Sequence, residues 1–150
     1  MKLKNHDILL FSIQDQDFGI EIEIVQRIIW AIEITPMPNV SNEILGVINV
    51  QGKIIPVMSM RRSLNYPEKE ISLSDRIILC QIKHHSIGLL VDEIKGIESY
   101  SKNDLEATKD IFHNVDKVDY VLKKEGKITF IYNWHHLLSW LDENHSLSTL

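Results

Sequence analysis

The chain has 150 residues, of which 44% are hydrophobic, and this length suits one compact domain or two very small domains that share a core. A chain of this size buries roughly 70% of the surface that its unfolded form exposes, so it can fold without disulfide or metal staples. The net charge is −5 and no basic block occurs, which argues against nucleic acid or an anionic membrane as the main partner.

The cysteine content and the length of the apolar runs indicate the cellular compartment of the protein. The single cysteine, Cys80, lies in an apolar run, so the chain has no disulfide framework and the reducing cytoplasm is its simplest location. Residues 1–7 are polar, and no apolar run reaches the ~18 residues that a membrane span needs. The sequence therefore predicts a soluble, intracellular protein without a signal peptide or an anchor.

The N-terminal segment predicts two strands and one short helical turn. Ile8–Ile13 is a strand closed by a polar turn, and from residue 18 to residue 24 apolar and acidic residues alternate as in a half-buried strand. Val25, Ile28 and Ile29 then recur at i, i+3 and i+4, which predicts one helical turn. The two prolines between residues 35 and 39 predict an extended loop after it.

A β-hairpin follows the loop, and the rest of the chain is predicted to pack around it. Its strands are Ile44–Val50 and Ile54–Met58, joined by Gln51-Gly52. Gly52 supplies the positive φ of a two-residue primed turn, and Pro56 requires an edge, a bulge or a position that donates no hydrogen bond. Both strands are too apolar for a ribbon with one solvated face, so burial on both sides is expected.

The second half repeats the pattern of the first. After the polar loop of residues 63–74, the strands Arg76–Ile82 and Ile87–Ile94 are predicted, with a turn between them and an irregular segment after residue 98. Residues 118–123 and 127–132 form a last hairpin around Glu125-Gly126. Asn133 is expected to cap a helix with one apolar face formed by Trp134, Leu137, Leu138 and Leu141, and residues 142–150 are expected to be a frayed tail.

Two register shifts relate the halves of the chain. A shift of 69 places Ile8–Ile13 on Ile77–Ile82 and Phe18-Gly19 on Ile87-Gly88, and it also superimposes Ile22, Val25 and Ile28 on Val91, Ile94 and Ile97. A shift of 74 places Val47 on Val121, Gly52-Lys53-Ile54 on Gly126-Lys127-Ile128, Val57 on Ile131 and Leu64 on Leu138. Chance similarity between β-rich segments is the alternative. A diverged duplication predicts two small antiparallel barrels of about five strands each, packed through a shared apolar interface.

No motif of a common enzyme class occurs in the sequence. A phosphate-binding glycine loop, a nucleophile elbow, HExxH and CxxC are all absent. The histidine pairs His84-His85 and His135-His136 lack metal-ligand spacing and are expected to be solvated. Asp92 and Glu93 are expected to point to opposite faces of a strand, which makes a solvated role likelier than an acid-base pair. The sequence therefore predicts no catalytic residue, no metal and no cofactor.

The three tryptophans, Trp30, Trp134 and Trp140, are candidate markers of a ligand pocket. Trp134 is expected to belong to the core, because aromatic residues on apolar helix faces usually do. Trp30 precedes a polar loop, so core and surface positions stay open for it.

Four segments of the chain resemble the CheW-like coupling proteins of bacterial chemotaxis. They are FSIQDQDFGIEIEIVQRI (11–28), EITPMPNVSNEILGVINVQGKIIPVMSMRR (33–62), IGLLVDEIKGI (87–97) and EGKITFIYNWHHLL (125–138). Their combination of ITPMP, GVIN, GKIIPV and GLLVDEI is specific, and together they span nearly the whole chain in the family's order.

The resemblance implies a mainly β fold of two intertwined five-stranded SH3-like barrels around a shared hydrophobic core, with short helices. One subdomain is expected to comprise residues 14–75, and the other residues 8–13 and 76–141, with 142–150 as the tail. The implied function is a non-catalytic cytoplasmic adaptor without cofactors. It would link the regulatory domain of the histidine kinase CheA to the cytoplasmic tips of methyl-accepting receptors, in arrays at the inner face of the membrane.

The chain departs from the family pattern at four positions. The family usually has arginine where this chain has Gln51 and glutamate where it has Arg27, two side chains expected to pair at the kinase-facing surface. Ser59 replaces a common aspartate, and Tyr120 replaces a glycine. Neutral drift at exposed positions and an altered choice of partner remain equal alternatives.

Position in the resemblance also suggests docking residues. The kinase-interface candidates are Arg27, Thr35, Gln51 and Lys53, and the receptor-groove candidates are Val25, Ile28, Ile29 and Ile97. For the four apolar residues, burial in the core is the more common role. Two other functions stay open, namely coupling in another chemosensory pathway such as type IV pilus motility, and binding of a small ligand in a groove between the barrels.

Overall fold

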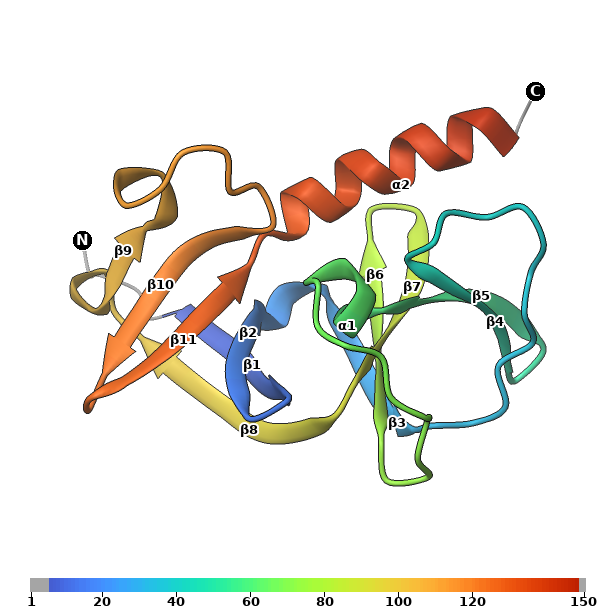
Figure 1. Ribbon diagram of the computed structural model, residues 1–150, viewed down its shortest axis with the longest axis horizontal. Helices are drawn as coiled ribbons and strands as arrows, with labels where there is room; N and C mark the ends of the chain where they lie inside the picture. Colours follow the sequence, from blue (N-terminus) through green and yellow to red (C-terminus); the bar gives the residue numbers. More distant parts are fainter. Residues whose placement is uncertain (1–5, 149–150) are drawn as a thin grey trace. The chain divides into compact units, whose positions relative to one another are not determined.

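The computed structural model describes residues 6–148, and side chains are described for residues 7–144. The described residues form strands β1 (His6–Ile13), β2 (Gln16–Glu21), β3 (Val25–Trp30), β4 (Ile44–Val50), β5 (Lys53–Ser59), β6 (Arg76–Ile82), β7 (His85–Val91), β8 (Glu93–Tyr100), β9 (Leu105–Ala107), β10 (Val118–Lys124) and β11 (Lys127–Tyr132). The helices are η1 (Ile22–Ile24), α1 (Met60–Ser63), η2 (Lys102–Asp104), η3 (Thr108–Asp110) and α2 (Trp134–Ser148) (Figure 1). The mainly β fold class, with short helices and a C-terminal helix, is confirmed.

The strands belong to two sheets, and each sheet takes strands from both halves of the chain. One sheet has the order β8-β1-β2-β11-β10-β9, and the other has the order β3-β6-β7-β5-β4. The hairpin β1–β2 therefore joins strands of the C-terminal half, while β6–β7 joins strands of the N-terminal half. The second sheet has the expected five strands, and the first has six because β9 adds to β10.

This exchange of hairpins decides how the chain divides into compact units. Unit 1 lies within residues 1–10, 16–22 and 96–150, and unit 2 comprises residues 11–15 and 23–95. The division differs from the expected boundary at residue 75. The reason is that β6 pairs antiparallel with β3 and β7 pairs with β5, which holds residues 76–91 in unit 2.

Residues that the two shifts relate lie in the cores of both units. Unit 2 has a core of Ile48, Ile55, Val57, Ile77 and Leu79, and unit 1 has a core of Ile8, Tyr100, Leu122 and Ile131. The shift of 74 relates Ile48 to Leu122 and Val57 to Ile131, and the shift of 69 relates Ile8 to Ile77. Three positions thus serve as the centre of the apolar packing in both units.

Each sheet contains one parallel pair of strands, so the expectation of purely antiparallel barrels is wrong. Ile131 in β11 pairs with Gly19 in β2, and Val57 in β5 pairs with Gly88 in β7. The two shifts relate these pairs to each other. In each parallel pair, a strand of one half of the chain lies beside a strand of the other half. The order of strands along the sequence does not predict whether two such strands run parallel or antiparallel.

The two glycines of the parallel pairs differ in the room that they leave for a side chain. A Cβ atom on Gly88 would lie 2.8 Å from Cγ2 of Ile77, whereas one on Gly19 would meet Cδ1 of Ile8 at 2.8 Å and Cδ1 of Ile131 at 3.1 Å. A Cγ2 atom is fixed by a stiff χ1 angle, while a Cδ1 atom moves with χ2.

We therefore expect Gly88→Ala to destabilise the fold by about 2 kcal/mol, and Gly19→Ala to cost clearly less. Urea unfolding of the two variants, with the slope of the transition checked, measures the difference. Equal losses in the free energy of unfolding would show that the γ methyl group of Ile77 moves aside as easily as the δ methyl groups of Ile8 and Ile131.

The predicted hairpin turns are confirmed, and they match each other. Gln51 and Gly52 have φ angles of 51° and 85°, and Glu125 and Gly126 have φ angles of 53° and 77°. Positive φ at both central residues is the signature of a type I′ turn, which suits the twist of the flanking strands. Asn49 supports the first turn, because its Oδ1 accepts a hydrogen bond of 2.8 Å from the backbone N of Gly52.

Pro56 occupies a position in β5 that needs no donor, as the sequence requires. It lies opposite Val47, whose backbone N and O both bond to Thr35 at 2.9 Å instead. The hairpin is less buried than expected, since the side chain of Ile54 is 59% exposed. Burial on both faces holds for the second half of β5, where the adjacent residues Val57 and Met58 are both buried.

The helical turn predicted from Val25, Ile28 and Ile29 is wrong, because these residues belong to β3. A register shift between Val25 and Arg27 inserts one extra residue opposite β6. Such a bulge interrupts the two-residue alternation of a strand and makes its apolar spacing resemble that of a helix. The half-buried strand expected up to residue 24 ends earlier, because residues 22–24 form η1.

The C-terminal helix begins as predicted and ends later. Oδ1 of Asn133 accepts hydrogen bonds from the backbone N atoms of His135 and His136 at 3.0 and 3.3 Å. Leu137 and Leu141 are buried, whereas Trp134 is half-buried and stacks on His135 with ring centroids 3.9 Å apart. Residues 142–148 continue the helix, so the frayed tail is wrong for them, and residues 149–150 lie outside the described chain. None of the helices in the described part of the chain is long and apolar enough to cross a membrane.

Candidate functional site

The four kinase-interface candidates are exposed and lie in unit 2, where the structure brings only part of them together. Gln51 and Lys53 share the β4–β5 turn. The Nζ atom of Lys53 donates a hydrogen bond of 2.7 Å to Oγ of Ser86, which ties this turn to the start of β7. Arg27 lies on β3, which is at the opposite end of the strand order from β4.

Thr35 bridges the loop before the hairpin to strand β4. Its backbone N and O bond to Val47 at 2.9 Å each, which extends the sheet by one position beyond β4. The loop beyond it lines an open cleft of about 500 Å³ with Ile34, Pro36, Met37, Val40, Ile44 and Leu45 among its walls. The cleft gives an apolar surface directly beside an expected docking residue.

The receptor-groove candidates fall on β3 of unit 2 and β8 of unit 1. Val25, Ile28 and Ile29 are half-buried, and Ile29 packs against the core of unit 2. Ile97 is the repeat counterpart of Ile28, yet it is 65% exposed. Burial in the core is thus wrong for Ile97, because it lies on the outward face of β8, whose residues alternate between exposed and less exposed positions.

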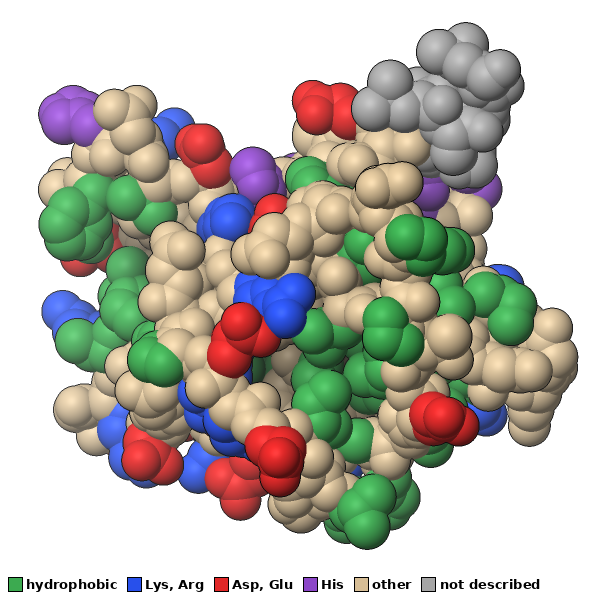
Figure 2. All heavy atoms as spheres, turned by 45° about the vertical axis from the view of Figure 1, so that its right-hand side comes forward, with side chains coloured by type: hydrophobic (Ala, Val, Ile, Leu, Met, Phe, Trp, Pro, Cys, Tyr) green, Lys and Arg blue, Asp and Glu red, His purple; other side chains and the backbone are tan. Residues whose placement is uncertain are grey.

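Exposed apolar side chains are common on both units, and Figure 2 shows several on the face it presents. In unit 2 they are Trp30, Ile32, Met37, Val40, Ile54, Ile71 and Leu73. Trp30 is 58% exposed, which settles its position in favour of the surface, and the guanidinium carbon of Arg76 lies 3.5 Å from its ring centroid. Contiguous apolar patches mark protein-binding sites, so these side chains are candidate contacts for a partner protein.

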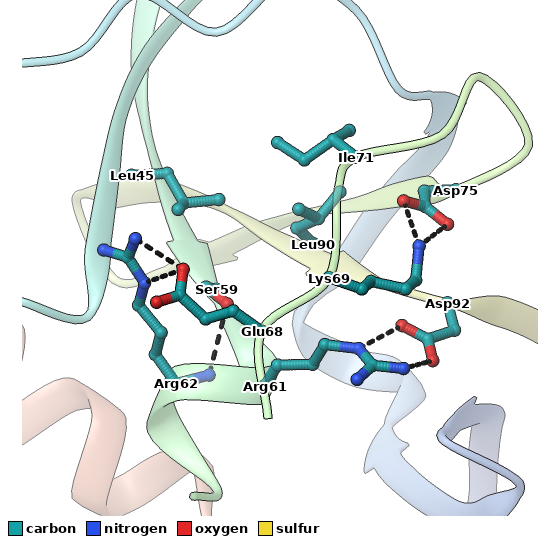
Figure 3. Close-up of a pocket in the computed structure, with 10 residues that line it drawn as sticks. All are labelled: Leu45, Ser59, Arg61, Arg62, Glu68, Lys69, Ile71, Asp75, Leu90 and Asp92. Atoms are coloured by element: carbon teal, nitrogen blue, oxygen red, sulfur yellow. Dashed lines mark hydrogen bonds and ion pairs between the residues drawn. The ribbon is translucent and has the colours of Figure 1, made fainter. Parts of the chain in front are cut away.

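A network of ion pairs, absent from the sequence-based expectations, lies around Arg61 in unit 2 (Figure 3). Ser59 ends β5 and caps α1, because its Oγ accepts a hydrogen bond of 3.2 Å from the backbone N of Arg62. This turn directs the side chain of Arg61 to Asp92, with Nε to Oδ1 at 3.0 Å and Nη2 to Oδ2 at 2.6 Å. Nη1 of Arg61 also donates to the backbone O of Pro67 at 2.7 Å and to Oε1 of Gln14 at 3.2 Å.

The same network holds the polar segment of residues 64–75, which we call the connector. Arg62 donates to Oε1 of Glu68 at 2.9 and 2.6 Å, and Nζ of Lys69 contacts both carboxylate oxygens of Asp75 at 2.8 Å. Leu45, Ile71 and Leu90 add apolar walls, and the partly open pocket between these residues has a volume of about 200 Å³ (Figure 3). The connector was expected to be a loop or linker, and it is a loop fixed mainly by charge.

The ion pair of Arg61 and Asp92 keeps both groups charged. Burial raises the pKa of the Asp92 carboxyl. Hydrogen bonds from Arg61 and from the backbone N of Gln14 lower this pKa, and their combined effect exceeds that of burial, so the pKa lies below its ordinary value. The hydrogen bond to Asp92 raises the pKa of Arg61, against the opposing effect of burial. Groups that stay ionised near neutral pH are poor proton donors and acceptors, so this arrangement positions chain segments rather than transferring protons.

The solvated role expected for Asp92 is therefore wrong. Asp92 lies at a bend between β7 and β8, where its side chain is 19% exposed and partnered. Glu93 is solvated as expected, with 66% of its side chain exposed. The expectation for His84 and His85 holds only for His84, because His85 begins β7 and is buried. A carboxylate directly after the buried run of residues 87–91 needs a partner, and this position could have indicated the pair with Arg61.

Comparisons with known proteins agree with this fold. A family model described as a CheW-like domain matches residues 7–142. Chemotaxis protein CheW of Rhizobium meliloti (strain 1021) is 32% identical over 111 residues, which cover 74% of this chain and 72% of the relative. Chemotaxis protein CheW of Thermotoga maritima is 31% identical over 106 residues, which cover 71% of this chain and 70% of the relative.

A solved structure is similar over most of the chain. It is the crystal structure of the scaffolding protein TtCheW from Thermoanaerobacter tengcongensis, with a TM-score of 0.79 and 26% sequence identity, and the match covers 87% of this chain and 90% of that chain. With the family model, this match includes the strands of both sheets. The chain belongs to the CheW-like family.

Proposed function

We propose that this protein is a non-catalytic adaptor of bacterial chemotaxis, which couples methyl-accepting chemoreceptors to the histidine kinase CheA. The observation that carries the proposal is the extent of the family match, residues 7–142, which includes strands of both units. The proposal places the protein in the cytoplasm, recruited to receptor arrays at the inner face of the membrane.

Surface features of unit 2 support docking to the regulatory domain of CheA. Arg27, Thr35, Gln51 and Lys53 are exposed, and the cleft beside Thr35 offers apolar area next to them. Val25, Ile28, Ile29 and Ile97 remain proposed contacts of the receptor tip, of which Ile97 has the largest exposed area available for binding. A small number of apolar anchors with polar neighbours is the usual composition of such interfaces.

Titration calorimetry with the regulatory domain of CheA from the same genome tests the proposal. Micromolar or tighter binding is the expected result. Absence of heat with that domain, together with capture of a different kinase from cell extract, would move the protein to another chemosensory pathway. Absence of any kinase partner would contradict the adaptor role.

The changed residues at positions 27 and 51 allow a second measurement. If altered partner choice is the reason for them, Arg27→Glu with Gln51→Arg should strengthen binding to a conventional CheA regulatory domain by about tenfold, because interfacial charges act mainly on specificity. Lys127→Gln, at an exposed residue of the corresponding hairpin in unit 1, gives the same change in net charge and serves as the control. An affinity that stays within error in the double variant would favour neutral drift.

A further inference from the structure

Unit 1 contains an open cavity of about 500 Å³ that the proposed adaptor function does not use. Three elements form it, namely η3 with the loop after it, strand β10, and the first turns of helix α2. Its polar walls are Thr108, Lys109, Asp116, Asp119, His135 and His136. The cavity lies within one unit, so all of its walls are positioned by that unit's own packing.

Two buried oxygen atoms in the walls of this cavity have no hydrogen-bond partner. Thr108 is only 4% exposed, and its Oγ1 is unpartnered. Oδ1 of Asp119 is also buried without a partner. Buried polar atoms in folded proteins nearly always have partners, so two such atoms in the wall of one cavity indicate a ligand that supplies donors.

A β-bulge directs Asp119 into the cavity. The register of β10 against β11 shifts between Val118 and Tyr120, so Asp119 is the extra residue of the bulge. The other repeat has the same bulge, with a register shift between Ile44 and Gly46, and there the extra residue is Leu45. Because a leucine serves at this position in unit 2, the fold requires the bulge but not a carboxylate. Bulges commonly redirect a side chain at a binding site.

The charges around Asp119 favour a positively charged ligand. Burial raises the pKa of Asp119 to about 6, and the carboxylate of Glu21 on β2 adds to this effect. Hydrogen bonds from the backbone N–H groups of Asp119 and Tyr120, and the charge of His135 on α2, act in the opposite direction. The carboxyl group is thus mostly ionised at neutral pH and is destabilised there by its surroundings. A cationic nitrogen would relieve this cost and donate charge-assisted hydrogen bonds, which are stronger than those between neutral groups.

We propose that this cavity binds a cationic nitrogen group, an ammonium or a guanidinium, with Oδ1 of Asp119 and Oγ1 of Thr108 as its acceptors. Two sources carry this chemistry, a free polyamine and an arginine side chain of a partner protein. Asp116 adds a negative charge to the lining of the cavity, and Lys109 adds a positive charge that opposes the binding of a cation.

Titration calorimetry of the full chain with spermidine and with N-acetyl-argininamide tests the proposal near neutral pH and at low salt. Millimolar or tighter binding of either probe is expected, and the tighter probe identifies the source. Asp119→Asn should weaken binding about tenfold, since it removes the charge and keeps the shape. Thr108→Val should weaken binding, and Thr108→Ser should restore it.

Asp110→Asn is the matched control, because Asp110 is an exposed carboxylate of the same segment outside the cavity. The affinity of this variant for either probe should equal that of the wild type. Lowering the pH through about 6 should weaken binding to the wild type more than to Asp119→Asn, because only the wild type loses the charge of Asp119. The other ionisable groups around the cavity, Glu21, Tyr100, Lys109, Asp116, His135 and His136, are common to both proteins. Absence of binding by both probes, equal binding by Asp119→Asn, or equal loss in Asp110→Asn would overturn the proposal. Binding of the CheA regulatory domain by the same variants is measured separately, so failure of one inference leaves the other testable.

Discussion

Gly46→Ala is expected to destabilise the fold by about 4 kcal/mol, the largest effect of a single methyl group that we anticipate in this chain. Gly46 has a φ of 152°, and a Cβ atom there would lie 2.7 Å from the carbonyl carbon of Thr35 and 2.9 Å from Cα of Pro36. Both neighbours are backbone atoms, so the loop must move. Its movement breaks the two hydrogen bonds between Thr35 and Val47. Thermal and urea unfolding measure the loss.

Gly96→Ala is the control for Gly46→Ala, because Gly96 has a φ of 129° but no atom within 4 Å of the added Cβ. The Gly96→Ala variant has the unfavourable φ angle without a steric clash, so it should lower the free energy of unfolding by only about 1–2 kcal/mol. Similar losses for the two variants would mean that the contact with the Thr35 loop contributes little to stability. The kinase-binding measurement on Gly46→Ala, carried out below its melting temperature, would then show whether the position of Thr35 matters for docking.

Asp92→Asn should lower the free energy of unfolding by about 3 kcal/mol, because it leaves the Arg61 guanidinium largely buried without its counter-charge. The side chains of Arg61 and Asp92 are 13% and 19% exposed, and two hydrogen bonds of 3.0 and 2.6 Å join them. Denaturant unfolding measures the change. Glu68→Gln is the control, since Glu68 is 63% exposed in its pair with Arg62, and its loss should stay below about 1 kcal/mol.

The effect of Asp92→Asn should also depend on pH with a definite sign. The pKa of Asp92 is lower in the folded protein than its ordinary value of about 3.9, so at acidic pH the folded state binds fewer protons at this group than the unfolded state does. Its stabilising effect is complete above the unfolded pKa and is lost as the pH falls through the folded pKa. The difference between wild type and variant should therefore be constant near neutral pH and shrink below about pH 4. A difference that persists at pH 2 would point to packing rather than charge.

Much of the fold could be predicted from local patterns in the sequence. The hairpin turns at residues 51–52 and 125–126 follow from glycine between β-branched runs, and both take the expected positive φ. The repeat of the glycines and of the apolar register predicted the equivalent positions that the two cores share. These features depend on residues close in sequence, where propensity and periodicity act directly.

The exchange of hairpins between halves could not be predicted in the same way. Whether β6–β7 pairs with β3 and β5 or with strands of its own half depends on contacts between segments that are far apart in the sequence. The bulge after Val25 made a strand resemble a helix, since one extra residue changes the spacing of the apolar side chains. Tertiary pairing decides both cases, and a single sequence does not encode it locally.

In the candidate site, too, some residues could be named from the sequence, and others become visible only in the tertiary structure. The resemblance supplied the candidates Arg27, Thr35, Gln51 and Lys53, which stay proposals, and the structure adds that all four are exposed. The pair of Arg61 and Asp92 joins residues 31 positions apart, and no spacing rule connects them. Asp119 was missed because its importance depends on a bulge, which becomes visible only when the register of β10 and β11 is known.

The exchanged hairpin also has a consequence for the nascent chain on the ribosome. The strands β1 and β2 are synthesised first, but Gln16 meets its partner Ile128 only after 112 further residues have been added. At a rate of about 5–20 residues per second, the hairpin therefore waits for roughly 6–22 s with an open edge. The apolar side chain of Phe18, which is 2% exposed in the finished protein, is uncovered during that interval. Folding of unit 1 thus waits until β11 has been synthesised, and in that interval the β1–β2 hairpin is a natural substrate for chaperones that shield β-edges.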